Sequence, residues 1–132
     1  MGQLANRLNG LGETLSTLVQ ALGLSYSDTV ILVMSEFGRT AQENGNSGTD
    51  HGHGNVMWMM GGKVRGGKVY GQWPGLAGSE LYEGRDLAIT TDFREVISAA
   101  LETQFGLTTT QLMKVVPNGP KPSRDAREIF RT

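Results

Sequence analysis

The sequence contains no cysteine, which excludes disulfide bonds, thiolate metal ligands and cysteine nucleophiles. It also has no apolar run of about 18 residues, so we expect no helix that spans a membrane. The formal net charge of -1 is far from the strongly basic balance of a dedicated nucleic-acid binder, and we expect no nucleic-acid partner. Residues 1–15 lack the basic start and the continuous apolar stretch that are typical of a secretory signal peptide.

Glycine, in contrast, is abundant and unevenly placed. Of the 132 residues, 19 are glycine, and 13 of these lie between Gly38 and Gly84. Because glycine is favoured where the backbone turns sharply or approaches another group closely, this distribution predicts a loop-rich centre. The length and the 38% hydrophobic content predict one folded domain, which we place at residues 1–117, followed by a loosely packed tail over residues 118–132.

Residues 4–22 predict an amphipathic helix. Six leucines recur at alternating spacings of four and three residues, which places them on one stripe of such a helix. Gly23 then supplies a C-terminal cap. The same spacing is typical of a coiled coil, but Gly10 and Gly12 interrupt it, so we favour a helix that lies on a sheet. The leucines are Leu4, Leu8, Leu11, Leu15, Leu18 and Leu22.

Residues 29–34 form a continuous run of β-branched and apolar side chains. Such a run predicts a strand buried on both faces, as in the middle of a parallel sheet. A helix, a short loop and a buried strand make half of a βαβ unit, so we predict an α/β fold with helices packed on a mostly parallel sheet. Because ligands of such sheets bind outside the carboxyl ends of the strands, the polar segment 35–40 is the first candidate site.

The remaining sequence predicts four further elements. Residues 56–60 indicate a second strand, and residues 63–70 indicate a glycine-rich hairpin around a Gly-Gly turn. A helix begins at Asp92, a residue type that suits the N-cap, and ends at Gly106. A short amphipathic piece over residues 109–116 follows it.

Both histidines lie in one short segment, next to a carboxylate. Imidazole nitrogen and carboxylate oxygen are ligands that suit zinc, manganese and related divalent ions. We therefore predict His51 as a metal ligand, with Asp50 and His53 as auxiliary ligands. The alternative interpretation is a pair of surface histidines in a flexible loop.

Two more candidates, Glu36 and Arg39, follow the predicted strand directly. The carboxylate of Glu36 can bind a metal ion, and the planar guanidinium of Arg39 can hold a phosphate or sulfate group. The spacing between Glu36 and His51 lets the intervening loop fold back and bring both side chains to one ion. The alternative is a strand-end turn with a surface ion pair.

Three other patterns do not support a function. The spacing Gly62-x-x-x-x-Gly67-Lys68 is similar to a phosphate-binding P-loop, but Val69 stands where a magnesium-binding Ser or Thr is required. The aromatic residues lack the basic field of a nucleic-acid module. No serine lies in a Gly-x-Ser-x-Gly elbow, so a hydrolase with a Ser-His-Asp triad on an α/β fold has no support.

Four blocks of the sequence resemble one known family in their order and spacing. They are Ser35–Thr40, Asn44-Gly45, Gly48–Gly52 and Gly61–Gly71. These blocks are similar to the C-terminal part of bacterial proteins of domain-of-unknown-function family 1501, and the resemblance runs from roughly residue 4 to residue 117. That family is grouped with the sulfatases and alkaline phosphatases. The resemblance therefore implies the C-terminal portion of an alkaline-phosphatase-like fold, with helices around a mostly parallel sheet, and a di-metal hydrolase site.

The resemblance also implies roles for single residues. Glu36 would take the position of a metal-binding carboxylate, and His51 resembles a later His-Gly ligand. Asp50 and His53 are weaker candidates. Phe37 stands where the superfamily has a metal-binding histidine, so this chain departs from the pattern and one ligand is lost or moved.

We therefore hypothesise that the chain is the C-terminal fragment of a metal-dependent hydrolase of phosphoric or sulfuric esters, inactive alone. Zinc, manganese or calcium would be the metal, a small anionic ester the substrate, and Arg39 the holder of the anionic group. The alternative is a non-catalytic binding or scaffold domain that kept the fold and lost the metal site. An open sheet edge would favour self-association. For the full-length family member, the resemblance implies an exported or periplasmic location.

Overall fold

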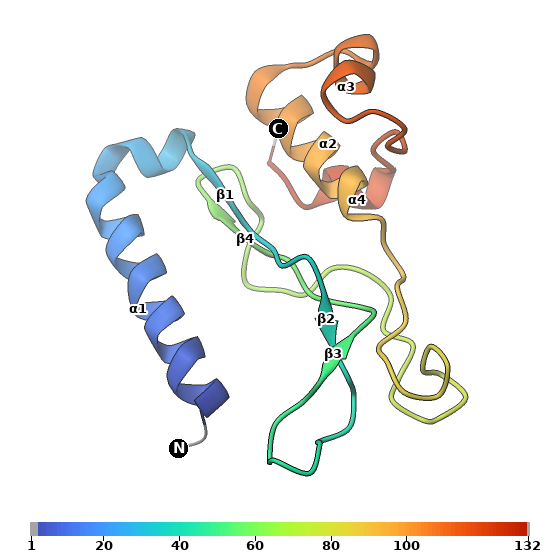
Figure 1. Cartoon of the computed structure of the whole chain (residues 1–132). Helices are drawn as coiled ribbons and strands as arrows, with labels where there is room; N and C mark the ends of the chain where they lie inside the picture. The colour runs from blue at the N-terminus through green and yellow to red at the C-terminus, as the bar shows by residue number, and fades with distance from the viewer. Residues whose placement is uncertain (1–2, 132) are drawn as a thin grey trace.

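The structure is a computed structural model that describes residues 3–131. Four α-helices, one short 3-10 helix and four short strands are connected by long loops in the centre of the chain (Figure 1). In chain order they are α1 (Gln3–Leu22), η1 (Gly23–Asp28), β1 (Val30–Val33), β2 (Gly38–Arg39), β3 (His51–Gly52), β4 (Trp58–Gly61), α2 (Phe93–Phe105), α3 (Thr109–Val115) and α4 (Arg124–Glu128).

The strands form two antiparallel pairs. β1 pairs with β4, with Val30 opposite Gly61 and Val33 opposite Trp58, and β2 pairs with β3. The predicted fold of helices packed on a mostly parallel sheet is therefore wrong for residues 3–131. A parallel pair needs a crossover, usually a helix, that returns the chain to the start of the sheet. Here the chain between β1 and β4 contains only the β2–β3 hairpin, so β4 comes back in the opposite direction.

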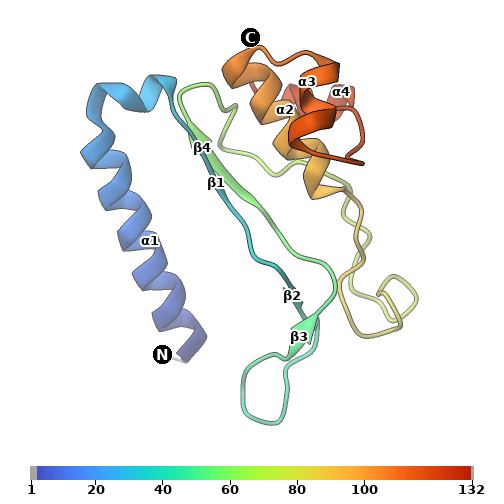
Figure 2. The same cartoon turned by 45° about the horizontal axis from the view of Figure 1, so that its top comes forward.

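Helix α1 forms as its leucine spacing predicts, but it does not lie on a sheet. None of its residues is buried, and the element that it packs against is η1, which follows it directly. Figures 1 and 2 agree in showing α1 apart from both pairs of strands. Periodicity thus predicted the helix correctly and its neighbour wrongly.

The hydrophobic core lies between α2, α4 and one face of the β1–β4 pair. Val30 and Leu32 of β1 pack against it from that face, together with Met59 of β4. In both views the C-terminal helices gather beside β1 and β4 and away from α1 (Figure 2). The buried members of the core are Val64, Val96, Ala99, Ala100, Ala126, Ile129 and Phe130.

The segment after residue 117 was expected to be loosely packed, and the structure differs from this expectation. Phe130 is 1% exposed, and Arg127 Nε lies 2.6 Å from Glu102 Oε2 of α2. The Glu102 carboxylate raises the pKa of Arg127 by this hydrogen bond. Phe130 also forms an antiparallel bridge with Val64. This bridge takes the place of the hairpin predicted over residues 63–70, in which the structure places no strand.

The predicted caps of α2 are confirmed. The Asp92 side chain accepts a hydrogen bond from the backbone N–H of Arg94, and Gly106 ends the helix in the left-handed region with φ of 64°. Glycine pays no Cβ penalty in that region, so it suits this position. The short amphipathic piece over residues 109–116 forms helix α3, which begins with a capping box between Thr108 and Gln111. Among residues 3–131, no helix has both the length and the apolar character needed to cross a bilayer.

Candidate functional site

The candidate site is built on the short hairpin formed by β2 and β3. Arg39 and His51 lie directly opposite each other in this antiparallel pair, so their side chains emerge on the same face. Thr40 extends the pairing by donating its backbone N–H to the carbonyl oxygen of Asp50 at 3.1 Å. The structure therefore places Arg39 and His51, twelve positions apart in sequence, side by side on the surface.

Glycine makes this close pairing possible. A Cβ atom on Gly38 would collide with the backbone carbonyl of Gly54, and one on Gly52 would collide with the backbone of Arg39. The glycines of this region thus serve close backbone approach, which is one of the two roles expected from their concentration. As a result the candidate side chains Arg39 and His51 lie on a segment that is tightly packed at the backbone and exposed at the side chains.

Phe37 is the platform of this face. Its ring stacks on the His51 ring with centroids 3.9 Å apart and planes inclined by 25°, and the Arg39 Cζ atom lies 5.7 Å from the Phe37 centroid. The Arg39 Nη1 atom also donates a hydrogen bond to the Thr49 carbonyl at 2.7 Å. Such contacts of a guanidinium with an aromatic ring are attractive and restrict its rotation. We call Phe37, Arg39 and His51 the Arg39–His51 face.

The loop that closes the hairpin has its own network of hydrogen bonds. The Asn44 Oδ1 atom accepts from the backbone N–H groups of Asn46 at 3.0 Å and Gly48 at 3.1 Å, and Asn44 Nδ2 donates to Asp50 Oδ1 at 2.9 Å. Ser47 lies at the tip with φ of 57°. We call this network the loop clamp, and the carboxylate of Asp50 is one of its members.

The other metal-ligand candidates, His53 and Glu36, are not members of the Arg39–His51 face. His53 stacks on Tyr82, with ring centroids 4.1 Å apart and planes inclined by 13°. Glu36 is exposed in the turn between β1 and β2. Within residues 3–131, no three imidazole or carboxylate groups come together in a way that could hold a metal ion. Metal binding by Glu36, Asp50, His51 or His53 therefore stays a prediction, and these residues do not by themselves make a complete ion site.

Asp86 is a residue near the site that sequence reasoning missed. It is 4% exposed, and its backbone bridges that of Thr40 at the end of β2. Arg85 Nη2 donates to Asp86 Oδ2 at 3.0 Å, and Arg85 Nε lies 2.9 Å from Asp86 Oδ1 without the alignment of a hydrogen bond. The only sign of this in the sequence is an adjacent Arg-Asp pair, which is common on surfaces. Its backbone bridge joins it to a segment more than forty positions away.

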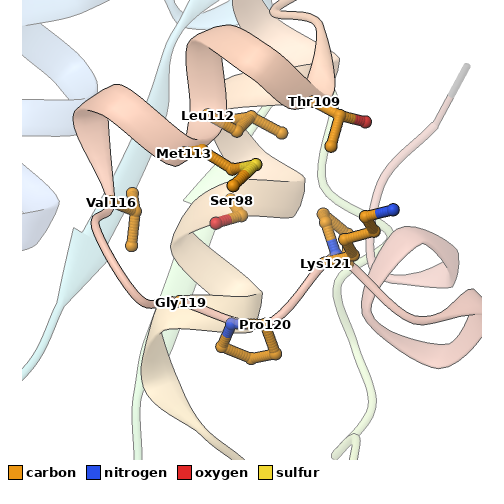
Figure 3. A pocket seen from close by; sticks show the side chains of 9 residues that line it. Ser98, Thr109, Leu112, Met113, Val116, Gly119, Pro120 and Lys121 are labelled. Carbon is orange, nitrogen blue, oxygen red and sulfur yellow. The ribbon is translucent and has the colours of Figure 1, made fainter.

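Two cavities lie away from the Arg39–His51 face. A crevice between α2 and α3 has a volume of about 10 Å³, enough for roughly one water molecule, and is lined by Ser98, Leu112 and Val116 among others (Figure 3). A larger groove of about 360 Å³ lies between β1 and α2. Neither is lined by a predicted site residue, and the side chains of Arg39 and His51 are exposed at the surface.

Comparison with known proteins gives one match. The family described as "Protein of unknown function (DUF1501)" matches residues 1–117. The curated proteins and the solved structures each contain no match to this chain. Because the matched region covers most of the 132 residues, the chain belongs to the DUF1501 family.

Proposed function

We propose that this chain takes part in the hydrolysis of a small phosphoric or sulfuric ester, and that Arg39 and His51 hold its anionic group. The chain would be the C-terminal part of a metal-dependent hydrolase related to the sulfatases and alkaline phosphatases. The observation that supports this proposal is the side-by-side placement of Arg39 and His51 over the Phe37 ring.

The chemistry of the two side chains suits a tetrahedral anion. A guanidinium carries five N–H donors, and Arg39 uses one of its nitrogens to fix itself on the Thr49 carbonyl. Its other nitrogen atoms can donate charge-assisted hydrogen bonds to phosphate or sulfate oxygens. The imidazole of His51 can donate from the same face, since an N–H is present in either protonation state.

The proposed hydrolase would use a metal ion, but residues 3–131 supply too few ligands for one. A divalent ion supplies charge that stabilises the leaving oxygen, and zinc usually takes three or four protein ligands. Residues 3–131 bring no three such ligands together, so this chain does not fit a complete ion site. We therefore assign no reaction step to an ion, and the role of the Arg39–His51 face rests on its own donors.

Titration with inorganic phosphate and sulfate, followed by NMR of backbone amides and histidine rings, tests the proposal. We expect saturable shifts at Arg39 and His51, and a weakening of about tenfold or more in Arg39→Gln, because a hydrogen bond to a charged group contributes roughly 1.5–3 kcal/mol. The matched control is Arg124→Gln. Arg124 has an 89% exposed side chain on α4, so this variant should bind as the wild type does. Equal weakening in both variants, or shifts spread over all basic residues, would contradict the proposal.

The loop clamp favours a second candidate, a non-catalytic binding or scaffold domain. In that case the polar residues between β2 and β3 hold the loop, and the stacking of His51 on Phe37 is part of the same structural role. His51→Ala would then lower the free energy of unfolding. The shifts of the Arg39 signals on addition of phosphate or sulfate would stay unchanged. The two candidates therefore differ in one result: His51→Ala weakens the binding of phosphate and sulfate under the first candidate and leaves it unchanged under the second.

A further inference from the structure

The six leucines of α1 form an apolar stripe with no buried member, although Leu15 and Leu22 are half-buried. Leu4 is 52% exposed, Leu8 is 46% exposed and Leu18 is 43% exposed. No residue of the helix is buried, although its leucines are the most regular apolar pattern in the sequence. We call Leu4, Leu8, Leu11, Leu15, Leu18 and Leu22 the leucine stripe.

The stripe needs a partner for energetic reasons. Most of the stability of a helix in a protein comes from packing of its apolar face, and glycines inside a helix lower its intrinsic stability. Helix α1 has two, Gly10 and Gly12, and each has open space around it. A helix of this composition with so little of its apolar face packed would be marginal in water, so we look for its partner outside the described residues of one chain.

The accessible surface of the whole chain also indicates that a partner is missing. The chain has an accessible surface of 9260 Å². A compact monomer of 14.2 kDa is expected to expose roughly 6,800 Å², so the excess is about 2,500 Å². A specific protein interface of standard size takes about 800 Å² from each partner. The excess is therefore large enough to supply a stable interface.

The spacing of the stripe identifies the occupant. Alternation of four and three residues is the a and d pattern of a two-helix coiled coil, in which each leucine fits between four residues of the facing helix. Such a seam is self-complementary, so the same stripe on another molecule fits it. The only charged residues of the helix are Arg7 and Glu13, so no row of like charges opposes the approach of a second copy. A β-sheet surface, in contrast, would not require a strict heptad.

We propose that α1 is a dimerisation helix that packs its leucine stripe against the leucine stripe of a second copy of this chain. This inference is independent of the proposed anion binding, because the Arg39–His51 face lies on β2 and β3. Self-association was expected at an open sheet edge, and this proposal places it instead at the leucine stripe of α1.

Analytical ultracentrifugation of the full chain at micromolar concentration tests the proposal. We expect a species of twice the 14.2 kDa chain mass in the wild type and a monomer in Leu11→Asp, which places a charge in the seam. The matched control is Leu24→Asp. Leu24 is 96% exposed and lies in η1 outside the stripe, so this variant should remain a dimer. A monomeric wild type, or a dimer that survives Leu11→Asp, would overturn the proposal and in the second case point to the sheet edge.

Cross-linking provides a test that does not depend on a destabilised variant. Because the chain has no cysteine, a single introduced cysteine gives a disulfide only with a second copy. Oxidation of Leu11→Cys reports a parallel pair, and oxidation of a mixture of Leu11→Cys and Leu15→Cys reports an antiparallel pair. We expect one of these to give a covalent dimer in high yield, while Leu24→Cys gives little. Absence of both products, with the helix intact by circular dichroism, would rule out the seam.

Discussion

The two ends of the chain differ in what covers their apolar side chains. Helix α1 carries six leucines and buries none of them, whereas α2, with a less regular pattern, buries Val96 and Ala99 against α4. A regular apolar spacing along a helix therefore does not ensure that its apolar side chains are buried. An apolar period therefore specifies a helix and the face that it packs, whereas the rest of the fold determines which element packs against that face.

The largest effect is expected from removing the side chain at the centre of the C-terminal core. Phe130→Ala should lower the free energy of unfolding by about 3–5 kcal/mol, because a fully buried aromatic ring leaves a cavity. Phe105→Ala is the matched control. Phe105 ends α2 but is 68% exposed, and its loss should cost about 0.5 kcal/mol or less. Urea unfolding of both variants measures the difference. Similar losses of free energy would show that the side chain of Phe130 is no more closely packed than that of Phe105.

A smaller effect is expected in the central region, where the backbone rather than a core is closely packed. Gly38→Ala places a methyl group against the Gly54 carbonyl and should cost about 1–3 kcal/mol, as overpacking usually does. It should also separate Phe37 from His51, and so remove the upfield ring-current shift of the His51 protons in NMR spectra. Gly45→Ala, in open space within the loop, should preserve that shift. An unchanged His51 spectrum in Gly38→Ala would contradict the described pairing of β2 and β3.

The smallest effect concerns the start of α2. Asp92→Ala removes the N-cap and should cost about 1 kcal/mol. Hydrogen bonds from Arg94 lower the pKa of Asp92 below its ordinary value of 3.8, so the carboxylate stabilises the folded chain above that value. This stabilisation is lost as the pH falls through the lowered pKa of the folded state.

The substitution Asp92→Asn separates capping from titration. The amide oxygen still accepts the Arg94 N–H bond, but it carries no charge to lose. Urea midpoints measured from neutral pH downward should therefore fall less steeply below pH 3.8 in Asp92→Asn than in the wild type. Parallel curves for the two proteins would mean that the Asp92–Arg94 pair contributes nothing to the pH dependence.

Local signals predicted the elements that local interactions stabilise. The N-cap at Asp92 and the left-handed cap at Gly106 defined α2, and the leucine spacing defined α1. The second strand also appears near its predicted place, as β4. These features depend on neighbours within a few residues, which a single sequence displays directly.

The features that sequence missed depend on distant contacts. The residues around Val64 give no sign that Phe130 pairs with it, and the residues around Asp86 give no sign that its backbone bridges that of Thr40. The direction of the β1–β4 pair depends likewise on how the intervening chain returns. For the site, the residue types of Arg39 and His51 pointed to anion or metal binding, but only the hairpin register places them together. The stacking of Phe37 on His51 was not predicted, because the resemblance gave Phe37 only as a replacement for a metal-binding histidine.

The bridge between Val64 and Phe130 also has a consequence for the order of events during synthesis. The two residues lie half the chain length apart, so residue 64 leaves the ribosome long before its partner has been made. Until then, Met59 and Val64 lack the side chains of Ile129 and Phe130 that share their hydrophobic core. Closure of a loop of this length is a slow, non-local step. The C-terminal core is therefore expected to form only after residue 130 has left the ribosome, while the segment around Val64 waits for its partner.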